Sequence, residues 1–88
     1  MNVALIGSGS WGTAVAGLAA ARAERVTMWA HSEQTATGIN AEHRNPRYLV
    51  DYELPGNVVA ATDLSQALDG AEAIIFAVPS AYERGHRQ

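Results

Sequence analysis

The feature that most constrains the fold of this chain is a glycine-rich turn directly after a short apolar run. Residues 3–6 are Val-Ala-Leu-Ile, and Gly7, Gly9 and Gly12 follow with the spacing Gly-x-Gly-x-x-Gly. The spacing alone is weak evidence, because apolar runs with glycines are common. Here a predicted helix over 13–22 and a predicted strand over 25–29 come next, which completes a strand–turn–helix–strand unit of about 30 residues. This context favours a turn that binds a pyrophosphate group.

Strand and helix signals alternate along the rest of the chain. We expect strands at 3–6, 25–29, 57–61 and 73–78, helices at 13–22, 33–42 and 64–68, and a loop with a turn of helix over 40–55. Ser32 and Asp63 are the expected N-caps of the second and third helices. In the first helix, Val15, Leu18 and Ala19 are expected on one apolar face.

Alternation of strands and helices predicts right-handed crossovers and a parallel sheet. The predicted fold class is α/β: a Rossmann-type parallel sheet, the first half (about four strands) of a doubly wound dinucleotide-binding domain. We expect residues 1–80 to form this partial NAD(P)-binding domain, with 81–88 as a polar tail of unclear structure.

Composition excludes several classes of function. The 88 residues carry a net charge of −3, and the six basic residues are all arginines without a basic run, so nucleic acid is not an expected partner. The absence of cysteine removes disulfides, thiolate catalysis and cysteine-bound metals. No segment has the roughly 20 apolar residues of a membrane span, and a basic signal-peptide start is missing. We expect a cytoplasmic protein without a membrane partner.

Each glycine of the turn has an expected physical role. Gly7 allows the tight turn out of the strand, Gly9 lets a pyrophosphate approach the backbone, and Gly12 lets the helix pack close to the sheet. The unpaired N–H groups at the helix start bind the anion. Ser10 is expected to offer a hydroxyl or backbone N–H to phosphate, and Trp11 either covers the cofactor or packs on a neighbouring loop.

The end of the second predicted strand bears on the choice between NAD and NADP. An acidic residue that binds the ribose hydroxyls is usual there, but the sequence reads Trp-Ala-His-Ser-Glu at 29–33. Glu33 comes late and serves equally well as a residue of the helix start. His31 and Ser32 are candidates for contact with an adenosine 2′-phosphate or the adenine, although an exposed histidine is often only solvated. The missing acid tilts the prediction towards tolerance of NADP rather than strict use of NAD, and the preference between the two stays open.

The end of the fourth predicted strand is a second candidate position. In this fold that strand lies beside the first, at the point where ligands bind. Val-Pro-Ser at 78–80 is therefore expected to face the cofactor, with Pro79 as the candidate contact. The alternative is that Pro79 only terminates the strand.

Taken in order, these segments resemble the N-terminal part of bacterial-type NAD(P)-dependent glycerol-3-phosphate dehydrogenase. The matching pieces are Gly-Ser-Gly-Ser-Trp-Gly-Thr-Ala at 7–14, Val-Thr-Met-Trp-Ala-His at 26–31, Asn40, His-Arg-Asn-Pro-Arg-Tyr-Leu at 43–49, Leu-Pro at 54–55, Thr-Asp-Leu at 62–64 and Val-Pro-Ser at 78–80. The resemblance implies cofactor contacts at Ser10, Trp11, His31 and Tyr48, with Ser32 a weaker candidate, and NADP or NAD as cofactor. It also implies interconversion of glycerol 3-phosphate and dihydroxyacetone phosphate for phospholipid synthesis, in a full-length homodimer.

The departures from this family are as informative as the matches. The family's catalytic lysines lie well beyond residue 88 and this chain contains no lysine. The second half of the sheet and the helical substrate domain are also missing, and the tail after Ser80 departs from the family pattern. We therefore expect a truncated, frameshifted or excised piece without catalytic or metal-binding residues, and without dehydrogenase activity of its own.

Three other interpretations stay open at this point. The chain is a stand-alone nucleotide-binding module, the N-terminal piece of another Rossmann dehydrogenase of the 6-phosphogluconate or hydroxyacid type, or a fragment that does not fold alone. The Trp-Gly-Thr-Ala stretch at 11–14 and the Tyr48 loop argue against the second of these.

Overall fold

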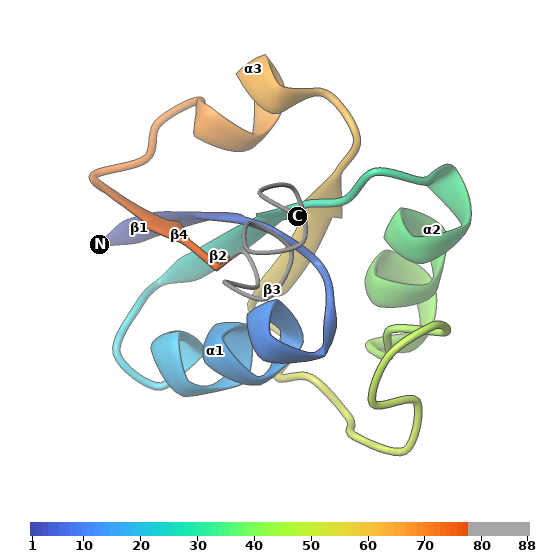
Figure 1. Ribbon diagram of the computed structural model, residues 1–88. Helices are drawn as coiled ribbons and strands as arrows, with labels where there is room; N and C mark the ends of the chain where they lie inside the picture. The colour runs from blue at the N-terminus through green and yellow to red at the C-terminus, as the bar shows by residue number, and fades with distance from the viewer. Residues whose placement is uncertain (78–88) are drawn as a thin grey trace, which may run out of the picture.

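The computed structural model describes residues 1–77 and contains a four-stranded parallel sheet with three helices (Figure 1). The elements are β1 (Asn2–Ile6), α1 (Ser10–Ala20), β2 (Arg25–Trp29), α2 (Glu33–Glu42), β3 (Val58–Ala61), α3 (Leu64–Leu68) and β4 (Ala73–Phe76). The strand order is β3-β2-β1-β4, and every neighbouring pair is parallel. The predicted α/β fold class and the position of the fourth strand beside the first are confirmed.

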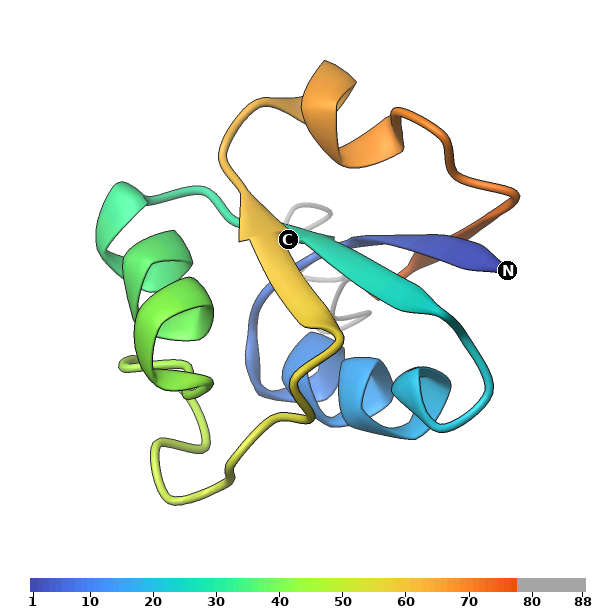
Figure 2. The same ribbon diagram turned by 180° about the vertical axis from the view of Figure 1, so that it is seen from behind.

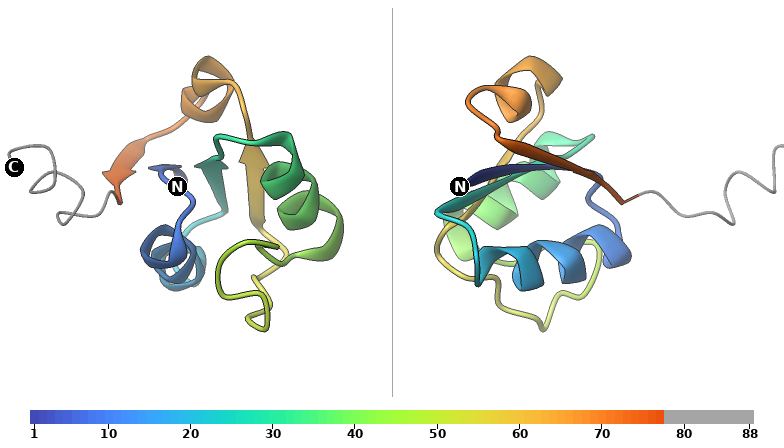
Figure 3. Two further views of the ribbon diagram at one scale, coloured as in Figure 1. Left: turned by 45° about the vertical axis from the view of Figure 1, so that its right-hand side comes forward. Right: turned by 90° about the vertical axis from the view of Figure 1, so that its left-hand side faces the viewer.

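The helices cover both faces of the sheet. Figure 3 shows α1 on one face and α3 on the opposite face, while α2 packs mainly against β3. Figure 2 shows residues 43–57 leading from the end of α2 to the start of β3. The chain moves from β1 outwards to β3 and then returns to the other side of β1. This reversal creates a crevice at the carboxyl ends of β1 and β4, where ligands bind in open α/β sheets.

The core is built from the central strands and small residues of α1. Leu5, Val26, Met28 and Val58 are fully buried in the sheet, and they pack with the α1 residues Ala16 and Ala20. Small side chains on the inner face of the helix let its backbone approach the strands closely, so burial of the strand side chains supplies most of the apolar contact.

The predicted apolar face of α1 is wrong at Leu18. Its side chain is 75% exposed, while Val15 and Ala19 are only partly buried against the core. The buried face instead follows Thr13, Ala16 and Ala20, whose spacing of three and four residues places them one above the other on a helix. The helix α1 begins at Ser10, three residues before the predicted start, so it has an additional first turn. The close packing of this turn fixes which face of the helix meets the sheet.

Most other boundaries agree with the predictions. The bounds of β2, α2 and α3 are as predicted, and Ser32 and Asp63 cap their helices with side-chain hydrogen bonds. The predicted turn of helix in the loop is wrong, because α2 runs to Glu42 and residues 43–57 contain only turns and bends. The strand β4 ends at Phe76, before the predicted residue 78, and residues 78–88 lie outside the described part of the chain.

The face of β4 away from α1 exposes two large apolar side chains. Ile74 is 50% exposed and Phe76 is 72% exposed. The helices make their main contacts with β1, β2 and β3, so within residues 1–77 this end of the sheet has little cover. None of the helices in the described region has the length and apolar character needed to cross a membrane.

Candidate functional site

Two glycines shape the turn between β1 and α1. Gly7 has a φ of 137°, and a Cβ there would lie 2.5 Å from the carbonyl oxygen of Ala77, so a side chain is excluded both by conformation and by space. A Cβ on Gly12 would lie 3.0 Å from the Gly7 carbonyl oxygen. Gly12 therefore allows the first turn of α1 to lie directly against the glycine turn.

Gly9 differs from these two glycines because it borders open space. No atom lies within 4 Å of the position that its Cβ would occupy. It is the N-cap of α1, has no side-chain capping bond, and its carbonyl accepts the first helical hydrogen bond from Thr13 N at 2.8 Å. The N–H groups of the first turn have no partner within the helix. Together with the helix dipole they form an anion-binding end that opens onto this space.

The open space is part of a pocket of about 260 Å³ at the carboxyl ends of the strands. Its walls come from the glycine turn, the start of α2, the loop between α2 and β3, and the residue after β4. The lining residues are Gly7, Ser8, Gly9, His31, Ser32, Thr35, Arg47, Tyr48 and Ala77. The structure thus brings together five predicted site residues: Gly7, Gly9, His31, Ser32 and Tyr48.

The start of α2 forms one wall of this pocket. The Ser32 hydroxyl oxygen accepts a hydrogen bond from Thr35 N at 3.1 Å, and the hydroxyl donates to Thr35 Oγ1 at 3.0 Å. The ring centroids of His31 and Trp29 are 4.6 Å apart, so a neighbouring aromatic ring orients the imidazole. Glu33 lines other hollows of the surface and does not line this pocket. The wall therefore presents hydroxyls and an imidazole without a carboxylate.

The loop after α2 forms another wall, and the buried side chain of Asn45 holds it in place. Asn45 Nδ2 donates to the Ser8 carbonyl oxygen at 2.7 Å and to Thr13 Oγ1 at 2.9 Å. Its Oδ1 accepts from Arg47 N at 3.0 Å and from Tyr48 N at 3.2 Å. All four hydrogen-bonding positions of the amide are used. One side chain therefore joins the glycine turn to the loop that carries Arg47 and Tyr48.

Thr13 extends this connection to Gly9. Its buried hydroxyl donates to the Gly9 carbonyl oxygen at 2.8 Å while accepting from Asn45. The glycine turn, the first turn of α1 and the loop are consequently linked by one continuous set of hydrogen bonds. Such a network fixes the relative positions of the pocket walls before any ligand arrives.

The two arginines of the loop have different surroundings. Arg44 donates from Nη1 to the Val50 carbonyl oxygen at 3.2 Å, and its Nη2 lies 3.9 Å from Glu53 Oε1. Arg47 is exposed at the pocket and forms no ion pair within residues 1–77. Among the described residues that line the pocket, it is the charged side chain.

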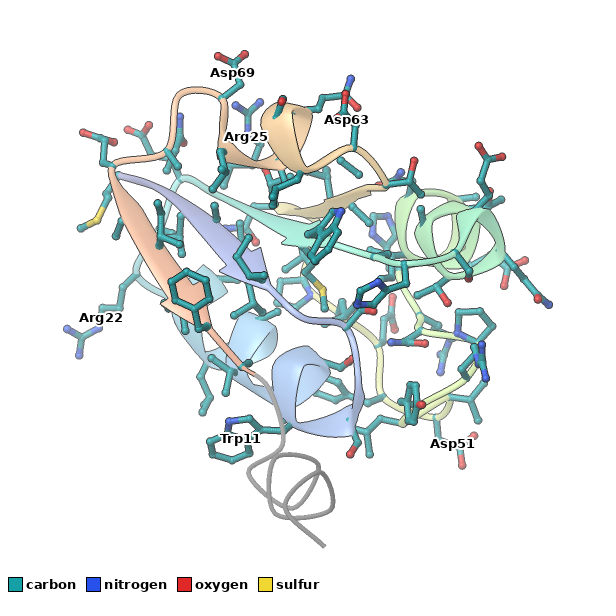
Figure 4. The ribbon with its side chains drawn as sticks, turned by 45° about the horizontal axis from the view of Figure 1, so that its top comes forward. Trp11, Arg22, Arg25, Asp51, Asp63 and Asp69 are labelled. Carbon is teal, nitrogen blue, oxygen red and sulfur yellow. The ribbon has the colours of Figure 1, made fainter. Side chains whose placement is uncertain are left out.

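Three predicted contacts, Ser10, Trp11 and Gly12, are not among the residues that line the pocket. Ser10 and Trp11 begin α1 and do not line the pocket, and Trp11 is 63% exposed. Figure 4 shows Trp11 at the outer side of the α1 start, away from the loop that carries Asp51. Gly12 is buried beneath the turn and acts through packing. Pro79 lies outside the described residues, so its contact stays a prediction.

Five residues of this candidate site are not among the predicted contacts, although Ser8 belongs to the turn at 7–12 that is predicted to bind pyrophosphate. Ser8, Thr35, Arg47 and Ala77 line the pocket, and Asn45 positions its loop. Arg47 and Asn45 lie in the Asn-Pro-Arg-Tyr segment at 45–48, next to the predicted Tyr48. Arg47 could have been predicted as a site residue because it is a cation next to Tyr48. The burial of Asn45 could not, because no local sequence pattern indicates it.

Comparison with known proteins identifies relatives of this chain. The family model described as the N-terminus of NAD-dependent glycerol-3-phosphate dehydrogenase matches residues 2–88. Glycerol-3-phosphate dehydrogenase [NAD(P)+] of Corynebacterium aurimucosum is 45% identical over 97% of this chain and 26% of its own length. The enzyme of the same name from Nocardia farcinica is 48% identical over 90% of the chain and 23% of its length. The chain thus spans about a quarter of the length of these curated relatives.

Solved structures agree with the sequence match. Glycerol-3-phosphate dehydrogenase from Saccharomyces cerevisiae superposes with a TM-score of 0.84 at 32% identity, over 97% of this chain and 28% of that one. The enzyme from Coxiella burnetii gives a TM-score of 0.75 at 35% identity, over 85% of this chain and 23% of that one. These matches favour the predicted resemblance over the 6-phosphogluconate or hydroxyacid alternative.

Proposed function

Because this chain belongs to the family of NAD-dependent glycerol-3-phosphate dehydrogenase N-terminal domains, we propose that residues 1–80 bind the adenosine-diphosphate half of NADP or NAD in the pocket above the glycine turn. The observation that carries this proposal is the open space at Gly9 in front of the free N–H groups of α1. A pyrophosphate placed there receives backbone hydrogen bonds and the favourable field of the helix dipole.

The other pocket walls suit the remainder of the adenosine-diphosphate half. His31 and Ser32 follow the carboxyl end of β2, where the adenosine ribose of a dinucleotide lies in this fold. Tyr48 is 43% exposed at the loop wall, so its ring offers a flat surface and a hydroxyl to the ligand. The Asn45 network fixes the backbone of this wall, which lowers the entropy lost on binding.

We extend the proposal to the full-length enzyme of which this chain represents the N-terminal quarter. We expect that enzyme to interconvert glycerol 3-phosphate and NAD(P)+ with dihydroxyacetone phosphate, NAD(P)H and a proton, and to serve phospholipid synthesis in the cytoplasm as a homodimer. The relatives carry the name of this dehydrogenase. The 88 residues contain no lysine, the residue type that the family uses for catalysis, so their proposed contribution is cofactor binding. Trp11, Ser10 and Pro79 remain proposed contacts of the bound cofactor.

Calorimetric titration of the purified 88-residue chain with ADP-ribose, NADH and NADPH tests the binding proposal. We expect all three ligands to bind and Gly9→Val to abolish binding, because the valine side chain fills the space for the pyrophosphate. Gly56→Val is the matched control, since Gly56 also borders open space but lies in the loop before β3, outside the pocket. Equal affinity of the Gly9 and Gly56 variants for NADPH would contradict the proposed site.

A further inference from the structure

We propose that Arg47 is the residue that selects NADP over NAD, by pairing with the 2′-phosphate on the adenosine ribose. The inference rests on the proposed function, because it concerns the same pocket. It goes further in assigning a cofactor preference and a specificity-determining side chain.

The first support is the charge of the pocket. In folds of this type a carboxylate after the second strand binds the 2′- and 3′-hydroxyls of NAD, whereas a nearby arginine accommodates the 2′-phosphate of NADP. Within residues 1–77 the pocket lining contains no Asp or Glu, and Arg47 is its charged member. Glu33, the first acidic residue after β2, lines neighbouring hollows instead. The pocket therefore favours the cofactor with the additional negative charge.

The second support is the position of Arg47 within the pocket wall. It lines the same pocket as His31 and Ser32, which follow β2 on the side where the adenosine ribose lies. Its backbone N–H donates a hydrogen bond of 3.0 Å to Asn45 Oδ1, so the backbone that carries the side chain is held in place. An arginine on a fixed backbone loses less entropy when its guanidinium forms paired hydrogen bonds with a phosphate.

The third support is the contrast with Arg44. The guanidinium of Arg44 already serves the loop itself through the Val50 carbonyl and Glu53. Arg47 makes no side-chain hydrogen bond or ion pair within residues 1–77. Arg44 thus stabilises the loop itself, whereas Arg47 lines the pocket.

A competing role for Arg47 is contact with the pyrophosphate, which NAD and NADP share. The pyrophosphate already has the glycine turn and the start of α1 as donors, while within the described lining the 2′-phosphate has no other cationic partner. The two roles predict different results. A pyrophosphate contact lowers the affinity for both cofactors equally, and a 2′-phosphate contact lowers the affinity for NADPH alone.

The experiment measures dissociation constants of NADPH and NADH for the 88-residue chain and three variants. We expect the chain to bind NADPH about tenfold or more tightly than NADH, as for one charge-assisted hydrogen-bond pair. Arg47→Gln should remove this preference while leaving NADH affinity within about twofold. Arg47→Lys should restore part of it, because the lysine keeps the charge but not the paired geometry. Arg22→Gln, which removes the same charge from an exposed position outside the pocket, should change neither constant.

Three results would overturn the inference: no preference of the unaltered chain for NADPH, an equal loss of affinity for both cofactors in Arg47→Gln, or an equal change in Arg22→Gln. Failure of the unaltered chain to bind NADH, NADPH and ADP-ribose has a different meaning, since it rejects the proposed function and the inference together. Far-ultraviolet circular dichroism of each variant shows whether it keeps the fold, and Arg47 is exposed, so its substitution leaves the core intact.

Discussion

Substitution of Asn45 by alanine is expected to loosen the cofactor pocket and to destabilise the fold together. The amide links the Ser8 carbonyl and the Thr13 hydroxyl on one side to the N–H groups of Arg47 and Tyr48 on the other. Alanine removes all four hydrogen bonds and cannot replace any of them. Asn45 is fully buried, and its bond to Thr13 is buried as well, so the Thr13 hydroxyl does not readily replace this partner with water.

The size of the effect follows from the number and burial of these bonds. A net contribution of about 1 kcal/mol for each bond gives about 4 kcal/mol. Three of the four bonds are only partly buried, so some partners regain water in the variant. We expect a loss of about 3 kcal/mol. A chain of 88 residues has a free energy of unfolding of about 4 to 13 kcal/mol, so this loss is a large share of its stability.

Urea unfolding followed by circular dichroism measures this loss, and titration with NADPH measures the effect on the pocket. Asn40→Ala is the matched control. Asn40 also bonds through both ends of its amide, to the Ala60 carbonyl at 3.0 Å and from the Ala60 N–H at 2.8 Å, but in an exposed setting outside the pocket. We expect a cost of about 1 kcal/mol for this control and unchanged NADPH affinity. The Asn45 variant should bind NADPH about tenfold more weakly.

Thr13→Val provides a milder test of the same network, because it removes the bonds of the Thr13 hydroxyl to Asn45 and Gly9 while keeping the side-chain volume. Its effect should combine with that of Asn45→Ala by less than the sum, since both substitutions remove the same bond. Full additivity, or an Asn45→Ala variant that matches Asn40→Ala in stability and NADPH affinity, would refute the positioning role of Asn45.

Two further substitutions test the turn and the helix start. Gly7→Ala should destabilise the fold by more than about 1 kcal/mol, because the turn requires a positive φ and the new Cβ meets the Ala77 carbonyl; thermal unfolding checks this, and an unchanged melting temperature would contradict it. Ser32→Ala should cost about 1 kcal/mol through loss of the N-cap bond to Thr35, and Ser32→Asp should recover most of that stability in the same assay.

Local sequence signals account for most of the fold. The bounds of β2 and α3 and the caps at Ser32 and Asp63 follow from residues close together in the chain. The order of the strands follows from the Rossmann-type fold that the glycine turn and the alternating elements predict. The buried face of α1 was not predictable in this way. Leu18 has the largest apolar side chain on that helix after Trp11, yet close approach to the sheet favours the small residues, and Leu18 is exposed.

Some residues of the candidate site are likewise predictable from local sequence, and others are not. The glycine turn and the residues after β2 were found because their function depends on local geometry. The loop wall depends on contacts between residues that are far apart in the sequence. Asn45 bonds to Thr13, which is 32 positions away, and to Ser8, which is 37 positions away. An asparagine before a proline is typical of exposed turns, so the sequence gives no sign that this one is buried. Arg47 acquires its role only because Asn45 fixes the backbone on which it lies.

The hydrogen bonds of Asn45 and Thr13 also couple binding to folding. A ligand that binds only the folded chain adds about 2.7 kcal/mol of stability at a concentration of 100 times its dissociation constant. This gain is close to the loss expected for Asn45→Ala, but that variant also binds NADPH more weakly, so a fixed NADPH concentration restores less of its stability. Asn40→Ala keeps its affinity and receives the full gain. The difference in melting temperature between the two variants should therefore widen as NADPH is added, whereas a purely structural role for Asn45 predicts a constant difference.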